Sequence, residues 1–281
     1  MPLKLSVVVP NHDYSRFLPR FFASLAAQTL GLDAVEVRFV DDKSSDDSLD
    51  VAMQIGQDLA CAHFAAVPLE RQGRPGPVRN AGLTRAKAGL LLCLDPDDLL
   101  APEYLATLVA VLEAEPGLGF AYTDFVLAEE NGPTREVRLP EFDPALLRTQ
   151  NIVAPTAMFR RAVWEQSRGF RRDTAYEDWD FWVQAAANGF AGRRIPRALY
   201  THCVHGANFS NQARLEDGPA KALIVRDNEA FFPAKTRQWA RALLAREAWA
   251  APLSRGIIPR PQDVDALLAA FSAEVEKRRK R

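Results

Sequence analysis

The feature that most constrains the fold is a run of apolar residues that ends abruptly in acids. Residues 90–94 are apolar, and Asp95, Asp97 and Asp98 follow at once. A short apolar run of this kind, preceded by Gly89, is typical of a strand buried on both faces of a parallel sheet. Open parallel sheets bind ligands just beyond the carboxyl ends of their strands. The three acids are therefore predicted to lie at a ligand site.

Two interpretations of these acids remain open from the motif alone. Neighbouring carboxylates raise one another's pKa unless a positive charge lies among them. Their hard oxygen atoms suit Mg²⁺ or Mn²⁺, which usually bind together with substrate phosphates. Asp and Pro are also common in solvated turns, so an ordinary loop is the alternative.

Strand and helix patterns alternate along the first half of the chain. This alternation predicts an α/β fold with a largely parallel sheet flanked by helices. The exits of the first four predicted strands then lie along one edge of that sheet. Three exits are acidic or polar, and the third in sequence carries Arg71, Arg74 and Arg79. The predicted strands cover residues 5–9, 35–40, 62–69, 90–94 and 119–127.

Arg79 is predicted to lie near the start of a helix. Pro77 suits the first helical position, which would place Arg79 in the first turn. A cation there opposes the helix dipole, whereas the N-terminus of a helix binds phosphate readily. Arg79 is therefore interpreted as a ligand of an anion, with a salt bridge to a neighbouring carboxylate as the alternative.

A second acidic motif, residues 177–182, opens another predicted helix. Asp178 would share a face with Phe181 and Trp182, whereas Asp180 would point elsewhere. An unpaired carboxylate beside an apolar face is costly to desolvate. We interpret Asp178 as a carboxylate that projects into the substrate cleft. The alternative is that it caps the helix, which would keep its pKa low.

The C-terminal part has a different character. Residues 215–232, 236–250 and 263–277 read as helices separated by prolines. We therefore predict a first domain over residues 1–211 and a helical extension over 212–281. The end, Lys277 to Arg281, is entirely basic. A solvated tail is the first interpretation of it, and a contact with anionic lipid head groups is the second.

Composition limits the classes of function and the compartment. The net charge of −1 over 281 residues argues against a general nucleic-acid binder. Three cysteines, an odd number, indicate a reducing compartment. Neither a signal peptide nor an apolar stretch long enough to cross a bilayer is evident. We expect a cytoplasmic protein, with contact at the inner face of the membrane through the tail as a secondary expectation.

Five motifs together resemble the family-2 inverting glycosyltransferases of the GT-A fold. The resemblance extends over roughly residues 3–211. Each motif is weak alone, and their order along the chain is what makes the resemblance specific. The motifs occupy residues 7–12, 40–46, 79–82, 94–98 and 177–182.

The resemblance implies a role for each matching position. A nucleotide-sugar donor would bind at the first strand exits, and a divalent metal, Mn²⁺ or Mg²⁺, at the acidic run. Asp178 matches the catalytic base. The implied donor-binding residues are Pro10, Asn11 and His12 around the base, Asp42 as acceptor of a hydrogen bond from the base, Arg79 near the diphosphate and Asp97 near the ribose. The implied metal ligands are Asp97, Asp98 and His205.

Two departures from the family pattern matter. Lys43 stands where the family usually has glycine, and it would pair with Asp41 or reach a phosphate. The Gln-x-x-Arg-Trp motif of the processive synthases is absent from the sequence. A non-processive, hexosyltransferase-like enzyme is therefore expected.

The resulting functional expectation is a metal-dependent inverting transferase. It would move a sugar from a nucleoside-diphosphate sugar, with UDP-sugar favoured, to a hydroxyl of a cell-envelope or lipid-linked glycan. The first alternative is a catalytically inactive nucleotide-sugar binding module. A sugar-1-phosphate nucleotidyltransferase ranks last, because residues 10–13 lack the glycine-rich loop of that class.

Overall fold

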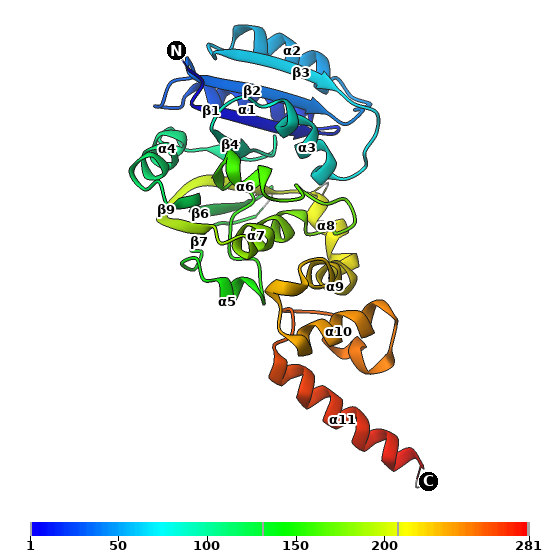
Figure 1. Cartoon of the computed structure of the whole chain (residues 1–281). Coiled ribbons are helices and arrows are strands. Elements are labelled where there is room, and N and C mark those ends of the chain that lie inside the picture. Colours follow the sequence, from blue (N-terminus) through cyan, green and yellow to red (C-terminus); the bar gives the residue numbers. More distant parts are fainter. Residues whose placement is uncertain (1, 131, 207, 280–281) are drawn as a thin grey trace.

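The structure is a computed structural model that describes residues 2–130, 132–206 and 208–279. Lys280 and Arg281 of the predicted basic tail lie outside this range. Strands of a single twisted sheet form the centre of the molecule, with helices on both faces (Figure 1). The predicted α/β class is confirmed.

The first half of the sheet is parallel and has the strand order β3-β2-β1-β4. Its carboxyl ends therefore meet at one edge, as predicted. The four strands are β1 (Leu5–Asn11), β2 (Val35–Asp41), β3 (His63–Pro68) and β4 (Leu90–Cys93). The helical segments of this half are η1 (Ser15–Phe17), α1 (Leu18–Ala26), α2 (Ser48–Asp58) and α3 (Pro75–Arg85).

The second half of the sheet is mixed, whereas the sheet as a whole is mostly parallel, as predicted. β8 pairs antiparallel with both β4 and β6, whereas β6 and β9 are parallel. The strands are β5 (Leu99–Leu100), β6 (Leu118–Glu129), β7 (Thr134–Val137), β8 (Met158–Arg160) and β9 (Ala191–Val204). The helices are α4 (Tyr104–Ala114), α5 (Pro144–Leu147), α6 (Arg161–Glu165) and α7 (Glu177–Ala187).

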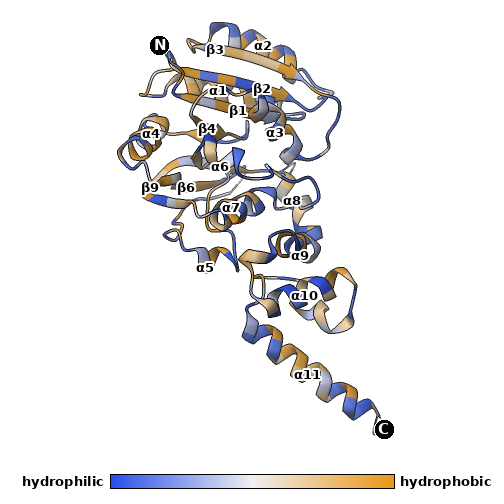
Figure 2. Ribbon diagram, in the orientation of Figure 1, coloured by the Kyte–Doolittle hydropathy of each residue, from blue (hydrophilic) through white to orange (hydrophobic). Residues whose placement is uncertain are grey.

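Helices follow β9 to the end of the described chain. Ile224, Trp239 and Val264 of these helices, and Ile258 just before α11, belong to the same buried cluster as the sheet residues. α11 leads away from the body, carries both polar and apolar residues, and ends in a polar segment (Figures 1 and 2). The segments are α8 (Phe209–Ala213), η2 (Arg214–Glu216), α9 (Asp217–Asp227), η3 (Glu229–Phe231), α10 (Ala234–Leu244), η4 (Ala248–Leu253) and α11 (Pro261–Arg279).

Within the described ranges, no helix has both the length and the apolar character needed to cross a bilayer.

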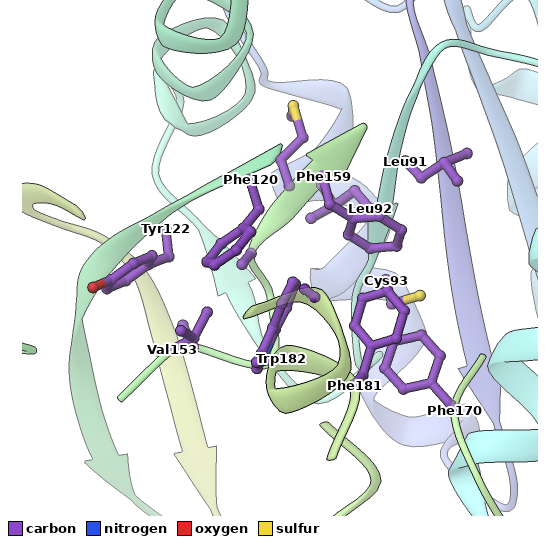
Figure 3. Packing of buried hydrophobic residues seen from close by; sticks show 14 of the residues in the cluster. Leu91, Leu92, Cys93, Phe120, Tyr122, Val153, Phe159, Phe170, Phe181 and Trp182 are labelled. Atoms are coloured by element: carbon purple, nitrogen blue, oxygen red, sulfur yellow. The ribbon is translucent and has the colours of Figure 1, made fainter. Parts of the chain in front are cut away.

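Helix α7 is held against the sheet by aromatic packing (Figure 3). The ring of Trp182 lies 4.9 Å from that of Phe120 on β6, and Phe181 lies 5.1 Å from Phe159 on β8, between ring centroids. Phe181 also stacks on Phe170 at 4.3 Å. These rings are buried, so the start of α7 has a defined position over the sheet.

Helix α3 begins earlier than predicted. Pro75, not Pro77, stands at its first position. Arg79 therefore lies beyond the first turn, and the dipole argument applies to it only weakly. Gly82 of α3 lies so close to β1 that an added Cβ would meet Val8 Cγ1 at 2.4 Å. The helix is thereby pressed onto the sheet, with Arg79 directed toward the strand ends.

Candidate active site

The ends of β1 and β2 are joined by side-chain hydrogen bonds. Asn11 Nδ2 donates to Asp41 Oδ1 at 2.9 Å and to Ser44 Oγ at 3.0 Å. Asn11 Oδ1 and His12 Nδ1 are buried and have no hydrogen-bond partner within the described part of the chain. Pro10, at the end of the same strand, is also buried. The three residues predicted around a nucleobase thus lie together, with two polar atoms unsatisfied.

Asp42 holds the loop that leads from β3 to α3. Its buried carboxylate pairs with the Arg71 guanidinium and accepts the amide of Gln72, and Gly73 N donates to Asp42 Oδ2 at 2.9 Å. The next residue, Lys43, has a φ of 56°, a left-handed conformation that glycine adopts most easily. Its ammonium pairs with Glu70 at 3.0 Å. Lys43 therefore pairs with Glu70 and not with Asp41, and the alternative that it reaches a phosphate stays a prediction.

Arg79 forms the salt bridges that were the alternative interpretation of this residue. Its Nη2 donates to both carboxylate oxygens of Asp95, at 2.9 and 3.1 Å. Its Nη1 pairs with Glu177, the first residue of α7. Arg79 is buried, and its guanidinium lies over the ring of Phe170. One guanidinium therefore ties the acidic loop after β4 to the start of α7.

The acidic loop is also tied to the end of β9. His205 Nε2 and Asn208 Nδ2 lie 3.0 and 2.9 Å from Asp97 Oδ2. His202 Nδ1 lies 3.0 Å from Asp98 Oδ1, which also accepts the amide of Cys203 at 3.1 Å. The structure thus brings together the three predicted metal ligands, and His205 is a hydrogen-bonding partner of Asp97.

Electrostatics in this cluster follow from burial. Desolvation, followed by the charges of Asp98 and Asp95, raises the pKa of Asp97 to about 8. Desolvation also raises the pKa of Asp98. Burial opposes a charge on His202, but its hydrogen bond to Asp98 and the nearby acids raise its pKa to about 9. Burial and then Arg16 lower the pKa of His205. Burial and the neighbouring acids therefore disfavour the ionised forms of Asp97 and Asp98.

These residues fit a divalent cation, although the described residues contain no preformed group of three or more His, Cys, Asp and Glu ligands. Asp98 Oδ2 is buried and has no hydrogen-bond partner in the described chain. Buried polar atoms are nearly always partnered. An oxygen-seeking cation would satisfy this atom and offset the raised pKa values of Asp97 and Asp98.

Asp178 is a half-buried carboxylate near the start of α7. Its Oδ2 accepts a hydrogen bond of 2.9 Å from Asn151 Nδ2. Burial raises the pKa of Asp178, partly offset by Arg79, whereas the capping alternative predicted a low pKa. Asp180 points elsewhere, as predicted: it is buried and pairs with Arg171.

Sequence reasoning did not assign four residues of this site. Glu177 lies within a recognised motif, but its pairing with Arg79 depends on the fold. His202 lies near the end of β9, three positions before His205, and could have been noted for that reason. Asn151 and Asn208 are single polar residues without a motif, and only the structure places them.

Comparison with known proteins gives the context of this site. Residues 6–167 match the family model described as glycosyl transferase family 2. An uncharacterized glycosyltransferase of Nostoc sp. is 29% identical over 221 residues, which cover 73% of this chain and 66% of that protein. The poly(ribitol-phosphate) β-N-acetylglucosaminyltransferase TarS of Staphylococcus aureus is 26% identical over 170 residues, which cover 57% of this chain and 28% of TarS. The chain thus spans less than two thirds of the length of these relatives.

Solved structures share the fold. TarS residues 1–349 in complex with UDP-GlcNAc give a TM-score of 0.68 at 21% identity, over 82% of this chain and 66% of that one. The mannosyltransferase PcManGT from Pyrobaculum calidifontis, in complex with GDP-Man and Mn²⁺, gives a TM-score of 0.62 at 20% identity. This match covers 97% of this chain and 80% of that one. The family match covers more than half of the chain. The chain therefore belongs to glycosyl transferase family 2, with the GT-A fold.

Proposed function

We propose that the protein is an inverting, non-processive glycosyltransferase that moves a sugar from a nucleoside-diphosphate sugar to an acceptor hydroxyl. The observation that carries this proposal is the double contact of Arg79 with Asp95 and Glu177. Arg79 contacts Asp95 in the acidic loop and Glu177 on α7, and Asp178 is the residue after Glu177. The candidate base therefore lies close to the acidic loop. Transfer requires this proximity, because the base and the leaving group act on one anomeric carbon.

The unsatisfied atoms at the end of β1 support a nucleobase site. Asn11 Oδ1 and His12 Nδ1 are buried without a partner in the described chain, and a base edge would supply one. Asp42 already accepts three N–H groups. A carboxylate has about four acceptor positions, which leaves one for the base. Pro10 would border the base and Asp97 the ribose. TarS bound to UDP and to UDP-GlcNAc supports a UDP-sugar.

The chemistry assigned to this chain is general base catalysis. Asp178 takes the proton of the acceptor hydroxyl as its oxygen attacks the anomeric carbon. The bond from that carbon to the diphosphate oxygen breaks, and the configuration inverts. Both Nη atoms of Arg79 bond carboxylates, those of Glu177 and Asp95. Arg79 would therefore act on the diphosphate indirectly, by holding Asp95 in the acidic loop.

A divalent cation completes the proposal. Asp97, Asp98 and His205 would hold Mn²⁺ or Mg²⁺ near the acidic loop. When bound, the cation supplies charge stabilisation to the departing nucleoside diphosphate. The Mn²⁺ complex of PcManGT supports the use of such a metal.

The acceptor and location are assigned by analogy. TarS acts on poly(ribitol-phosphate), which supports a cell-envelope or lipid-linked glycan as acceptor. We place the protein in the cytoplasm, with peripheral contact to the inner face of the membrane through the basic tail, residues 277–281. Residues 1–211 would carry the donor site and residues 212–281 would form the helical extension.

The test is a transfer assay with UDP-sugars, Mn²⁺ and a panel of glycan acceptors, read as UDP release and as the anomeric configuration of the product by NMR. The wild type should invert the donor configuration. Asp178→Asn should abolish transfer while it binds UDP normally, and Asp173→Asn, an exposed acid before α7, should leave transfer unchanged. UDP-sugar binding without transfer or hydrolysis under any acceptor would instead indicate an inactive binding module.

A further inference from the structure

Asn151 and Asp178 form a side-chain hydrogen bond between two separate elements. Asn151 lies in the segment between α5 and β8, and Asp178 lies on α7. Asn151 Nδ2 donates to Asp178 Oδ2 at 2.9 Å. Asn151 Oδ1 accepts the backbone amide of Val153 at 3.3 Å. A backbone N–H can only donate, so the amide oxygen must face Val153 and the NH₂ group must face Asp178.

The segment that carries Asn151 is anchored on both sides. Ile152, Val153 and Ala154 are buried. On the other side, Trp179 Nε1 donates to the carbonyl of Leu147 at 2.8 Å. This bond joins the residue after Asp178 to α5. The position of Asn151 relative to α7 is therefore set by packing and by backbone contacts, and not by the Asp178 contact alone.

The helical extension supports the same segment. Arg148 Nε donates to the carbonyl of Phe231 at 2.7 Å, and Ile258 N donates to the carbonyl of Thr149 at 2.9 Å. Phe231 and Ile258 are buried. Contacts from two separate parts of the extension therefore hold Arg148 and Thr149, which lie just before Asn151.

The charged groups around Asp178 do not by themselves keep its carboxylate ionised, and a neutral hydrogen-bond donor can contribute to this. The groups that act on it electrostatically are Arg79 of α3, Asp95 after β4, and its neighbours Glu177 and Tyr176. Arg79 is engaged by Asp95 and Glu177. Burial raises the pKa of Asp178, which works against a base that must be ionised. A donor on the carboxylate favours its charged form.

We propose that Asn151 is a positioning residue that orients Asp178 and favours its ionised form, an inference that rests on the proposed function. With Oδ2 held by Asn151, Oδ1 receives the proton of the acceptor hydroxyl. The new bond joins the acceptor oxygen to the anomeric carbon, and the leaving nucleoside diphosphate takes the electron pair of the broken bond.

The experiment compares the full-length wild type with Asn151→Ala and Asn151→Asp. The matched control is Asn188→Ala: Asn188 caps the other end of α7, is exposed, and donates one hydrogen bond to Gln166 O at 2.8 Å. The first readout is the pKa of Asp178 by ¹³C-carboxyl NMR titration, with the signal assigned by its loss in Asp178→Asn. The second is the pH profile of kcat and kcat/KM with UDP-sugar.

Asn151→Ala should raise the pKa of Asp178 by about one pH unit or more, because hydrogen bonds to charged groups are strong. It should lower kcat roughly 10- to 100-fold through misorientation of the base, with KM for the donor unchanged. The acidic limb of the pH profile should move to higher pH. Asn151→Asp should move the acidic limb to still higher pH, because the new carboxylate adds a negative charge beside Asp178.

Wild-type values in Asn151→Ala for the Asp178 titration and the pH profile would overturn the inference, as would equal shifts in Asn188→Ala. Thermal melts identify a variant that has simply lost its fold. The NMR titration needs no substrate. A shifted titration in a protein without transfer activity would thus overturn the proposed function, while the control of Asp178 by Asn151 would stand.

Discussion

Arg79 Nη2 lies 2.9 Å from Asp95 Oδ1, and this partly buried ion pair joins α3 to the loop that follows β4. The other Nη atom pairs with Glu177, so the same side chain also reaches α7. Helix α3, the acidic loop after β4 and the start of α7 therefore meet at one guanidinium. This arrangement accounts for the relative position of the acidic loop and Asp178.

Removal of the Arg79 charge should destabilise the protein strongly. Arg79→Ala leaves Glu177 buried without its cation, and the loss of one partner of a buried pair costs about 3–5 kcal/mol. Urea unfolding of the two proteins measures the difference. Arg85→Ala, which removes an exposed arginine from the same helix, should change the free energy of unfolding by less than about 0.5 kcal/mol. Equal effects of both variants would contradict the assigned role of Arg79.

Substitution by asparagine should reduce stability at Asp180 and transfer activity at Asp178. The buried Asp180 carboxylate is held by Arg171, and by Gln184 and Asn228 at 2.8 Å each. Asp180→Asn should therefore cost about 2–4 kcal/mol of stability. Asp178→Asn should change stability by less than about 1 kcal/mol and abolish transfer. Urea unfolding measures the stability of both variants, and UDP release measures their transfer activity. An inactive but stable Asp180→Asn together with an active but destabilised Asp178→Asn would contradict these assignments.

Glu177 should make stability depend on pH. Burial raises the pKa of Glu177 from 4.5 to about 7, although Arg79 opposes the shift. Between these pH values the folded protein holds a proton that the unfolded chain has released, so the free energy of unfolding falls as pH rises. The fall is up to about 3 kcal/mol. Denaturant unfolding from pH 4.5 to 8 should show a shallower decline in Glu177→Gln, and identical declines would show that Glu177 has no part in it.

Gly82 should tolerate no side chain. An added Cβ would lie 2.4 Å from Val8 Cγ1 and 3.0 Å from Val40 Cγ2. Gly82→Ala should therefore cost about 1–3 kcal/mol, as overpacking of a core usually does. At Gly89 an added Cβ meets nothing within 4 Å, so Gly89→Ala should be nearly neutral. Thermal melts of the two variants give the comparison, and a neutral Gly82→Ala would show that α3 can move away from the sheet.

Local patterns predicted the alternation of strands and helices, because each element is marked by apolar periodicity and by a turn at its end. The edge shared by Asn11, Asp42 and the acids after β4 followed from this alternation and the parallel order. The antiparallel insertion of β8 did not, because strand order in space depends on long-range packing. The division of the chain after residue 211 stays a prediction.

The candidate site was predictable where a motif marked it. Asp178 and Asp97 could be named, but the partners of Arg79 could not, since Asp95 and Glu177 come from different elements. The start of α3 was misplaced by two residues because both Pro75 and Pro77 suit a first helical position. Asn151 has no pattern at all, and only the packing of its segment beside α7 reveals it.

The proposed function requires that the protein binds and uses a nucleoside-diphosphate sugar. The most direct measurement is a thermal melt with UDP, GDP, dTDP and CMP and their sugars, each with Mn²⁺ or with EDTA. A ligand at a hundredfold its Kd stabilises the folded state by about 2.7 kcal/mol, or roughly 5–10 °C in Tm for a chain of this size. We expect a rise of this size with UDP and UDP-sugars, and we expect it to depend on Mn²⁺. An unchanged Tm with every nucleotide, with or without metal, would contradict the proposed function.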